Sequence, residues 1–221
     1  MKNPWLDLDF DSDQYLLDMD RDDIGRFNAG APLACRVIPE SIPEPFIGNP
    51  ESAKVVLLLL NPGHGESDRK SHRETEFKAT LFRNLRHEAQ EYPFYPLNPR
   101  FSHTGSAKWW QPRTRELGFE TGLDPKTLSR RLLAIEWFPY HSQYSAIGRS
   151  RICPSQEYTF QIAKQMLESK LVIAMRSIKH WAQVDTRFLT VPCLKNPRAC
   201  YVSRNNMDLG VFQEIVKTLK E

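Results

Sequence analysis

The chain has 221 residues, of which 40% are hydrophobic and 11% aromatic, and its formal net charge is +3 at pH 7. This composition is typical of a globular domain and excludes a disordered chain, while the mild positive charge permits a polyanionic partner without requiring one. No run approaches the roughly 20 apolar residues of a membrane span and no signal-peptide-like segment follows the acidic N-terminus, so we expect a cytoplasmic monomer without membrane contact.

Residues 1–45 are expected to form an N-terminal helical and extended segment that packs on the rest of a single α/β domain, residues 1–221. Apolar residues interspersed with aspartates in residues 1–30 predict a short amphipathic helix with a solvated acidic face. Five prolines in residues 31–53 predict an extended connector that leads into the first strand.

The stretch KVVLLLLNPGHG, residues 54–65, predicts a buried strand followed by a tight polar turn. Residues 55–60 are an unbroken apolar run, as in a strand that is covered on both faces. Asn61, Pro62 and Gly63 then form a turn signal. Because open α/β sheets bind ligands at the carboxyl ends of their strands, Asn61 is the first candidate for chemistry. The same three residues also fit an ordinary strand-to-helix turn.

The middle of the chain combines one predicted helix with one long predicted loop. Apolar positions at helical spacing predict a crossover helix over residues 74–90, which makes the next strand parallel to the first. Residues 92–110 are aromatic-rich and contain three prolines, and we predict a long loop there. Its Phe and Trp side chains have two interpretations: they stack on a bound base, or they pack in the core or in a lid.

The second half of the chain continues the alternation of helices and strands. Asp124 and Pro125 are an N-cap and a first-turn proline, and they predict a helix that ends near residue 131. Further strands are predicted at residues 132–138, 171–175 and 188–191, and further helices at residues 155–169, 178–184 and 207–219. This alternation predicts an α/β fold, a three-layer α/β/α sandwich with a central, mainly parallel sheet.

If the strands are parallel, the loops that follow them gather at one edge of the sheet. Convergent polar groups from several loops are what a binding pocket needs. The candidate pocket residues are Asn61, Gly63 and His64 after the first strand, Glu136, Tyr140 and His141 at the end of the second, and Asn196 after the fourth.

The stretch GNPESAKVVLLLLNPGHG, residues 48–65, resembles the first motif of the uracil-DNA glycosylase superfamily. The mismatch-specific thymine/uracil branch carries G-I-N-P-G at the end of its first strand, and Asn61, Pro62 and Gly63 match its N-P-G. Leu59 stands where the motif has its leading glycine. The resemblance covers roughly residues 45–220. It implies a central four-stranded sheet and a catalytic Asn61 that positions a water against C1′ of a flipped nucleotide.

The second conserved loop of the superfamily reads H-P-S-P-L-S, or N-P-S-G-L-S in the mismatch-specific branch. Asn196 and Pro197 match the opening N-P, whereas Arg198 replaces the serine and nothing after it matches. The resemblance implies contacts between this loop, the flipped base and the DNA backbone, so Lys195, Arg198 and Arg204 are candidates for phosphate binding. The alternative for the two arginines is an ordinary surface ion pair with a carboxylate.

Glu136 aligns with the asparagine that reads the uracil edge in the main uracil branch. A carboxamide both donates and accepts, whereas an ionised carboxylate only accepts and would repel uracil O4. An ionised Glu136 would suit a base edge with two donors, and it makes plain uracil a doubtful substrate. The alternatives are a Glu136 that pairs with a nearby arginine, or an alignment shifted by one residue.

The cysteine and histidine spacings do not indicate a metal site. The four cysteines are Cys35, Cys153, Cys193 and Cys200. They have no C-x-x-C spacing, and scattered cysteines suit a reducing compartment. His64 and His72 are not at the i, i+4 spacing of a helical metal site, and no cysteine lies near either. We therefore expect no metal and no cofactor.

The function that these features favour is base excision, the hydrolysis of an N-glycosidic bond in a modified or mismatched nucleotide of DNA, as in DNA repair. One alternative is a catalytically inactive module of the same fold that binds nucleic acid or a nucleotide. Another is hydrolysis of a small nucleoside-like ligand without DNA. A DNA enzyme should gather its cations around the pocket, namely Lys195, Arg198, Arg204, Arg149 and Arg151, whereas a small-molecule enzyme need not.

Overall fold

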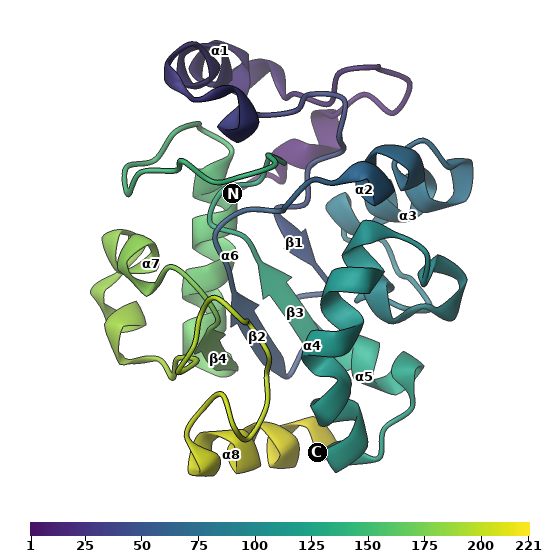
Figure 1. Ribbon diagram of the computed structural model, residues 1–221, viewed down its shortest axis with the longest axis vertical. Helices are drawn as coiled ribbons and strands as arrows, with labels where there is room; N and C mark the ends of the chain where they lie inside the picture. The colour runs from purple at the N-terminus through teal and green to yellow at the C-terminus, as the bar shows by residue number, and fades with distance from the viewer.

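The computed structural model describes residues 1–221 and shows a four-stranded sheet surrounded by helices (Figure 1). The strands are β1 Phe46–Ile47, β2 Val55–Leu58, β3 Leu132–Ile135 and β4 Leu171–Ala174. Their order is β1-β3-β2-β4, with β2 parallel to both β3 and β4, and β1 antiparallel to β3. An α/β fold with a mainly parallel, four-stranded sheet is therefore confirmed, and the three parallel strands begin at the predicted residues.

The remaining strand of the sheet is not the one that the sequence predicts. Residues 188–191 lie largely in the 3₁₀-helix Thr186–Thr190, whose first turn is capped by the Asp185 side chain. β1 comes instead from the proline-rich connector, and its two residues are too few for periodicity to reveal. Residues 192–194 run beside β4, where Ala174 makes two backbone hydrogen bonds to them, of 2.8 and 3.2 Å.

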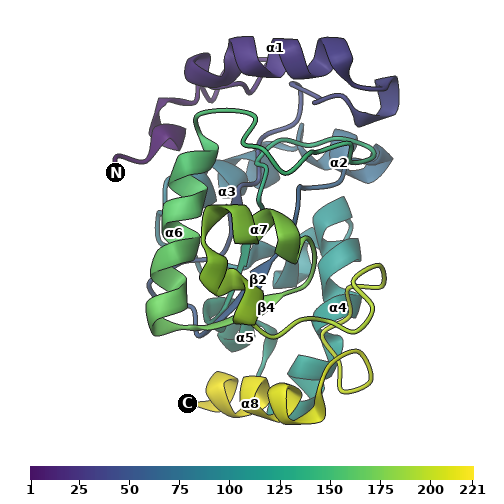
Figure 2. The same cartoon turned by 90° about the vertical axis from the view of Figure 1, so that its left-hand side faces the viewer.

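The helices lie around the sheet on several sides. They are α1 Arg21–Gly30, α2 Glu66–Ser71, α3 Thr75–Leu85, α4 Gly105–Thr121, α5 Pro125–Arg131, α6 Gln156–Ser169, α7 Ile178–Val184 and α8 Leu209–Lys220. In Figure 1, α6 and α7 lie to the left of the sheet, and α3, α4 and α5 lie to its right. Figure 2 confirms that α1 and α8 lie at opposite ends of the molecule. None of the helices combines the length and apolar character needed to cross a membrane.

Helix α4 corrects the prediction of a continuous loop over residues 92–110. It begins after Thr104, whose hydroxyl accepts a hydrogen bond from Ala107 N at 3.1 Å, and it ends at Gly122 in the left-handed conformation, with φ of 69°. Both are strong helix-end signals. Pro112 inside the helix and the glycine at its first position both disfavour helix in sequence-based reasoning, which is why the element was missed.

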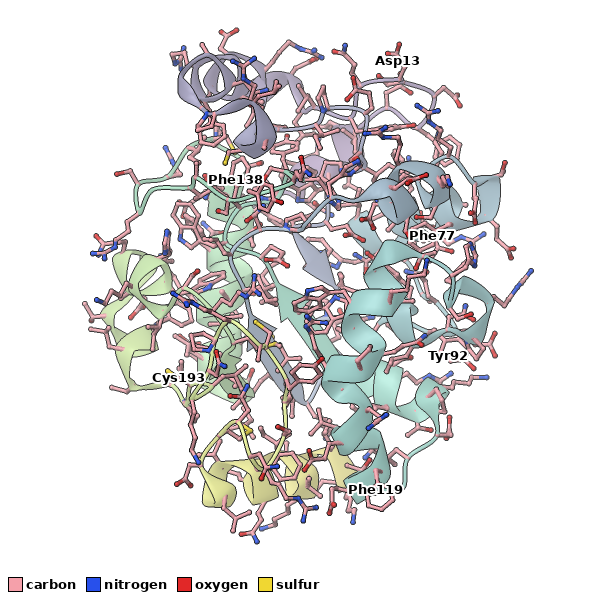
Figure 3. The ribbon with its side chains drawn as sticks, viewed as in Figure 1. Asp13, Phe77, Tyr92, Phe119, Phe138 and Cys193 are labelled. Atoms are coloured by element: carbon pink, nitrogen blue, oxygen red, sulfur yellow. The ribbon has the colours of Figure 1, made fainter.

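One continuous cluster of buried apolar side chains extends from Trp5 near the N-terminus to α8. The N-terminal segment is attached to the loop that follows β3. Phe27 of α1 packs against Phe138 with ring centres 5.9 Å apart, and Figure 3 shows Phe138 just below α1. The Tyr140 hydroxyl donates to the buried Asp20 carboxylate at 2.7 Å. These contacts hold the β3 loop, and with it the carboxyl edge of the sheet, in place.

Candidate functional site

A cavity of about 370 Å³ lies at the carboxyl ends of β2, β3 and β4, beside the first turns of α4. Its size is within the range of roughly 300–1,000 Å³ that small-molecule sites occupy. The wall is formed by Glu44 and Ile47, by residues 59–64, by Asp68, by Gly105, Ser106, Trp109 and Trp110, by Glu136, by residues 142–145 and by Arg176. The predicted pocket residues Asn61, Gly63, His64 and Glu136 are therefore brought together in one cavity.

Asn61 is held in a fixed orientation on the cavity wall. Its side-chain amide donates to Pro62 O at 3.1 Å and to the Ser142 hydroxyl at 3.0 Å. Both donor hydrogens of the amide are thereby used, and no protein group donates to Asn61 Oδ1. An oriented amide oxygen that faces a cavity can accept a hydrogen bond from a water or a ligand.

Glu136 follows the last residue of β3 directly, and its side chain is almost completely buried, with 6% exposure. Its Oε2 has no hydrogen-bond partner. Burial raises the pKa of Glu136 well above its usual value, and the nearby Glu44 raises it further. The raised pKa favours the protonated form of the carboxyl group, which both donates and accepts. Burial thus disfavours the ionised, acceptor-only form of Glu136 that the sequence analysis considered, and Glu136 forms no ion pair with an arginine.

His64 and Gly63 line the cavity directly after Asn61. The His64 Nδ1 and the Ser41 hydroxyl are hydrogen-bonded at 2.9 Å. Burial lowers the pKa of His64, and the neighbouring His141 lowers it further, so the ring is neutral at pH 7. Gly63 contributes its backbone: the carbonyl oxygen accepts from His141 Nδ1 at 2.6 Å, which ties the Asn61 turn to the β3 loop.

Asp68 is a carboxylate of the cavity wall that sequence analysis did not select. Its Oδ2 accepts from Gly65 N at 2.8 Å. Its other oxygen lies against the first residue of α4, because a Cβ atom built on Gly105 would be 2.0 Å from Asp68 Oδ1. Glycine at this position is therefore what allows the Asp68 side chain to lie beside the N-terminus of α4, where a negative charge is favoured.

Aromatic rings and one guanidinium complete the wall. Trp109 is half-buried, with the Arg113 guanidinium over one face of its ring at 4.0 Å, and Tyr144 is largely exposed. Of the aromatic residues in 92–110, Phe94, Tyr95, Phe101 and Trp110 are buried in the core, so core packing applies to these four, while stacking on a base stays a prediction for Trp109. Arg176 has no carboxylate within ion-pair distance, and it donates to the backbone of residues 197–198 at 3.1 and 3.3 Å.

Two predicted pocket residues, Tyr140 and His141, are not part of the cavity wall. Tyr140 is buried and makes its hydrogen bonds to Asp20 and to Leu17 N. His141 is also buried, behind Glu44, whose Oε2 lies 3.4 Å from His141 Nε2. Tyr140 therefore anchors the N-terminal segment, whereas His141 contacts the cavity only through a neighbour.

The loop predicted to match the second superfamily motif also lies outside the cavity wall. The Asn196 side chain accepts from the backbone N–H groups of Arg198 and Ala199, at 3.1 and 3.4 Å, as in a simple turn. Lys195 and Arg198 are exposed. The loop reaches the cavity through Arg176, which donates to its backbone and to the Cys200 Sγ atom at 2.7 Å.

The predicted cations do not gather around the cavity. Arg204 forms ion pairs with Glu116 and Glu120 of α4, the first at 2.9 Å, which matches the ion-pair alternative for this residue. Arg149 and Arg151 are exposed loop residues that do not line the cavity. Arg176 is the cation that the wall contains, and it directly follows the third predicted strand, residues 171–175. The rule that ligands bind at the carboxyl ends of parallel strands, which selected Asn61 and Glu136, also selects Arg176.

Comparison of the chain with protein-family models, with curated proteins and with solved structures found no match. The geometry and chemistry of the cavity therefore carry the functional inference.

Proposed function

We propose that this protein is a uracil-DNA glycosylase-like enzyme that hydrolyses the N-glycosidic bond of a modified or mismatched nucleotide flipped into the cavity. One observation carries this proposal. Asn61 and Glu136, to which the resemblance assigns the water and the base, follow two neighbouring parallel strands and line one cavity. The motifs that carry the resemblance are short. Asn61 and Glu136 are nevertheless 75 positions apart in the sequence and line the same cavity, as two residues that act on one nucleotide must.

The finer fold that we propose is the three-layer α/β/α sandwich of that superfamily. The helices on the two sides of the sheet in Figure 1 support it. A further support is the chain beside β4: residues 192–194 extend the parallel series β3-β2-β4 by two backbone hydrogen bonds. In this description β1 is an additional antiparallel strand at the opposite edge.

The proposed chemistry assigns one role to each group of the wall. Asn61 Oδ1 accepts a hydrogen bond from a water and aims it at C1′ of the sugar. Asp68 provides a negative charge that favours the positive charge developing at C1′ as the bond to the base breaks. Trp109 stacks on the base, and Arg176 binds a phosphate of the flipped nucleotide. The base leaves with the electron pair of the broken bond.

A neutral Glu136 changes the expected choice of base. Its O–H group donates to a carbonyl oxygen and its C=O group accepts from a ring N–H, as the amide of an asparagine does. The repulsion that an ionised carboxylate would exert on uracil O4 is then absent. Plain uracil therefore belongs in the proposed substrate class together with modified bases that present an adjacent donor and acceptor.

The experiment that tests this proposal is a single-turnover excision assay over oligonucleotides that each carry one modified or mismatched base. We expect wild-type protein to release at least one base, and Asn61→Ala to reduce the rate by roughly 10- to 100-fold. This range is the loss of one hydrogen bond of about 1–3 kcal/mol to the attacking water. Asn205→Ala changes an exposed asparagine outside the cavity and should keep the wild-type rate. Equal rates for the wild type and Asn61→Ala would contradict the assigned role.

The charge distribution favours a second candidate, hydrolysis of a free nucleoside or nucleotide. Three carboxyl groups and a single guanidinium line the cavity, and Arg204 is engaged by two glutamates. A DNA enzyme usually surrounds its pocket with cations. Free nucleosides added to the same panel decide between the two: release from nucleosides but not from oligonucleotides would favour this candidate, and binding without release would identify an inactive module.

A further inference from the structure

Three buried side chains lie close together at the cavity wall, and the roles assigned above use none of them. Glu44 precedes β1, His72 ends α2 and His141 follows β3, and their nitrogen and carboxylate atoms lie within 4.8 Å of one another. Nε2 of both histidines is buried without a hydrogen-bond partner. Unpaired polar atoms are costly in a protein interior, so this cluster calls for a functional explanation.

The hydrogen bond at Nδ1 of each histidine determines which of its two ring nitrogens carries the proton. His141 Nδ1 donates to Gly63 O, which leaves a lone pair on its Nε2. His72 Nδ1 accepts from Ile42 N at 3.1 Å, so its Nε2 carries the proton. A histidine that binds a metal through Nε2 donates its Nδ1–H to a neighbour. His72 does the opposite, so this donor set does not fit a metal ion but does fit a site that holds and transfers protons.

We propose that Glu44, held by a hydrogen bond from the Tyr95 hydroxyl and adjacent to His141, is the catalytic residue that accepts the proton of the attacking water. This inference rests on the proposed function, and it supplies what Asn61 lacks, because an amide is no base. The Glu44 carboxyl group lines the cavity, and the Tyr95 hydroxyl donates to its Oε1. Its Oε2 lies 3.4 Å from His141 Nε2, within ion-pair distance but without a hydrogen bond.

The loop that follows β3 contacts both the water-binding amide and the proton acceptor. Asn61 donates to the Ser142 hydroxyl at 3.0 Å, and Ser142 N donates to Pro62 O at 3.4 Å. The adjacent His141 donates to Gly63 O. Glu44 N donates to Pro139 O of the same loop at 3.0 Å, so the loop after β3 is attached to both groups.

The water, the substrate and Glu44 together account for every bond and proton in the proposed reaction. A bond forms between the water oxygen and C1′, and the bond between C1′ and the base nitrogen breaks, with its electron pair leaving on the base. The water proton passes to the Glu44 carboxylate, which returns it to solvent after the products leave. The released base takes its own proton from bulk water. No oxidant, reductant or metal is needed.

This role predicts activity that increases with pH. Burial raises the pKa of Glu44 to about 8, the hydrogen bond from Tyr95 opposes this, and the charge of Asp68 adds to it. The other titratable groups that face Glu44 are Glu136, whose pKa is raised, and His72 and His141, whose pKa values are lowered by burial. Both histidines are therefore neutral above pH 7. The base form of Glu44 accumulates as the pH rises towards 8, and the rate should rise with it.

The variant that tests this role is Glu44→Gln, which keeps the hydrogen bond from Tyr95 and can donate to His141. We expect the wild-type single-turnover rate to rise up to tenfold per pH unit between pH 6 and about 8, the pKa of Glu44, and then to level off. Glu44→Gln should lose roughly 100-fold at the plateau and show no rise, as expected when a general base is removed. Glu51→Gln, a change at an exposed position just after β1, should retain the wild-type profile. A wild-type profile in Glu44→Gln would overturn the proposal.

A readout without substrate separates this inference from the proposed function. The side-chain carboxyl carbon of Glu44, followed by NMR in the wild-type protein, should titrate near pH 8. Titration near the usual value of glutamic acid would overturn the proton-accepting role of Glu44, whether or not the protein is active. Stoichiometric metal that is lost in His72→Ala would overturn it as well. If no substrate releases its nucleobase, the proposed function is overturned, and the proton-accepting role of Glu44 is overturned with it. If the wild type and Glu44→Gln release the nucleobase at equal rates, only the role of Glu44 is overturned.

Discussion

Glu136→Ala is expected to reduce the single-turnover rate of base release by about 30- to 1,000-fold, while Glu136→Gln stays within about tenfold of the wild type. The alanine variant removes a donor and an acceptor from the base edge, which together cost about 2–4 kcal/mol. The glutamine variant replaces a neutral carboxyl group with an amide of the same shape that also donates and accepts. The measurement is the release rate at pH 7 on the best base of the panel.

The contrast between the two variants is the informative part, because it depends on Glu136 being neutral. If Glu136 acted as an anion, glutamine would be as harmful as alanine. Unfolding of both variants in denaturant provides the control for folding, and their midpoints should lie close to that of the wild type, since Glu136 Oε2 has no hydrogen bond to lose. Equal losses in both variants at unchanged stability would contradict the neutral carboxyl group.

Gly48→Ala is expected to destabilise the protein by about 3 kcal/mol or more. Gly48 follows β1 with φ of 117°, and a Cβ atom there would lie 2.5 Å from Leu132 O and 3.1 Å from Leu133 Cα. These are backbone atoms of β3, which cannot move aside as a flexible side chain can. Unfavourable φ and overpacking each cost about 1–3 kcal/mol. Denaturant unfolding monitored by circular dichroism measures the sum.

A second glycine provides the matched control for this substitution. Gly25 lies inside α1, and a Cβ atom there would meet nothing within 4 Å. Gly25→Ala should therefore raise the free energy of unfolding by about 0.5–1 kcal/mol, as expected for glycine to alanine in a helix. A loss below 1 kcal/mol in Gly48→Ala would show that β1 and β3 do not approach as closely as described.

The sequence predicted those parts of the fold that depend on long apolar patterns. The strands that begin at Val55, Leu132 and Leu171 are buried and branched-chain rich, and burial on both faces makes such runs conspicuous. β1 has two residues and carries no pattern of its own. It exists because Gly48 permits a close approach to β3 and because Asn84 of α3 bonds to the backbone on both sides of it, at 3.0 and 2.7 Å. Such tertiary contacts leave no local signal.

The candidate site was predictable to the extent that it follows strand ends. Glu136 comes directly after β3 and Asn61 three residues after the end of β2, and the carboxyl-edge rule places both in the cavity. Asn196 and Arg204 were selected by similarity to a loop motif, and both side chains are used within the protein instead. Glu44 lies before a strand too short to predict, so no sequence rule pointed to it.

The measurement that tests the central claim most directly is the release of free uracil, quantified by mass spectrometry, from a uracil-containing oligonucleotide in a single turnover at pH 7. Wild-type protein should release uracil and leave one abasic site for each base, because a neutral Glu136 pairs with the uracil edge and Asn61 presents the water. Asn61→Ala and Glu136→Ala should both release it much more slowly. An oligonucleotide that the wild-type protein binds but leaves intact, or release of other bases while uracil is refused, would contradict this account of the site.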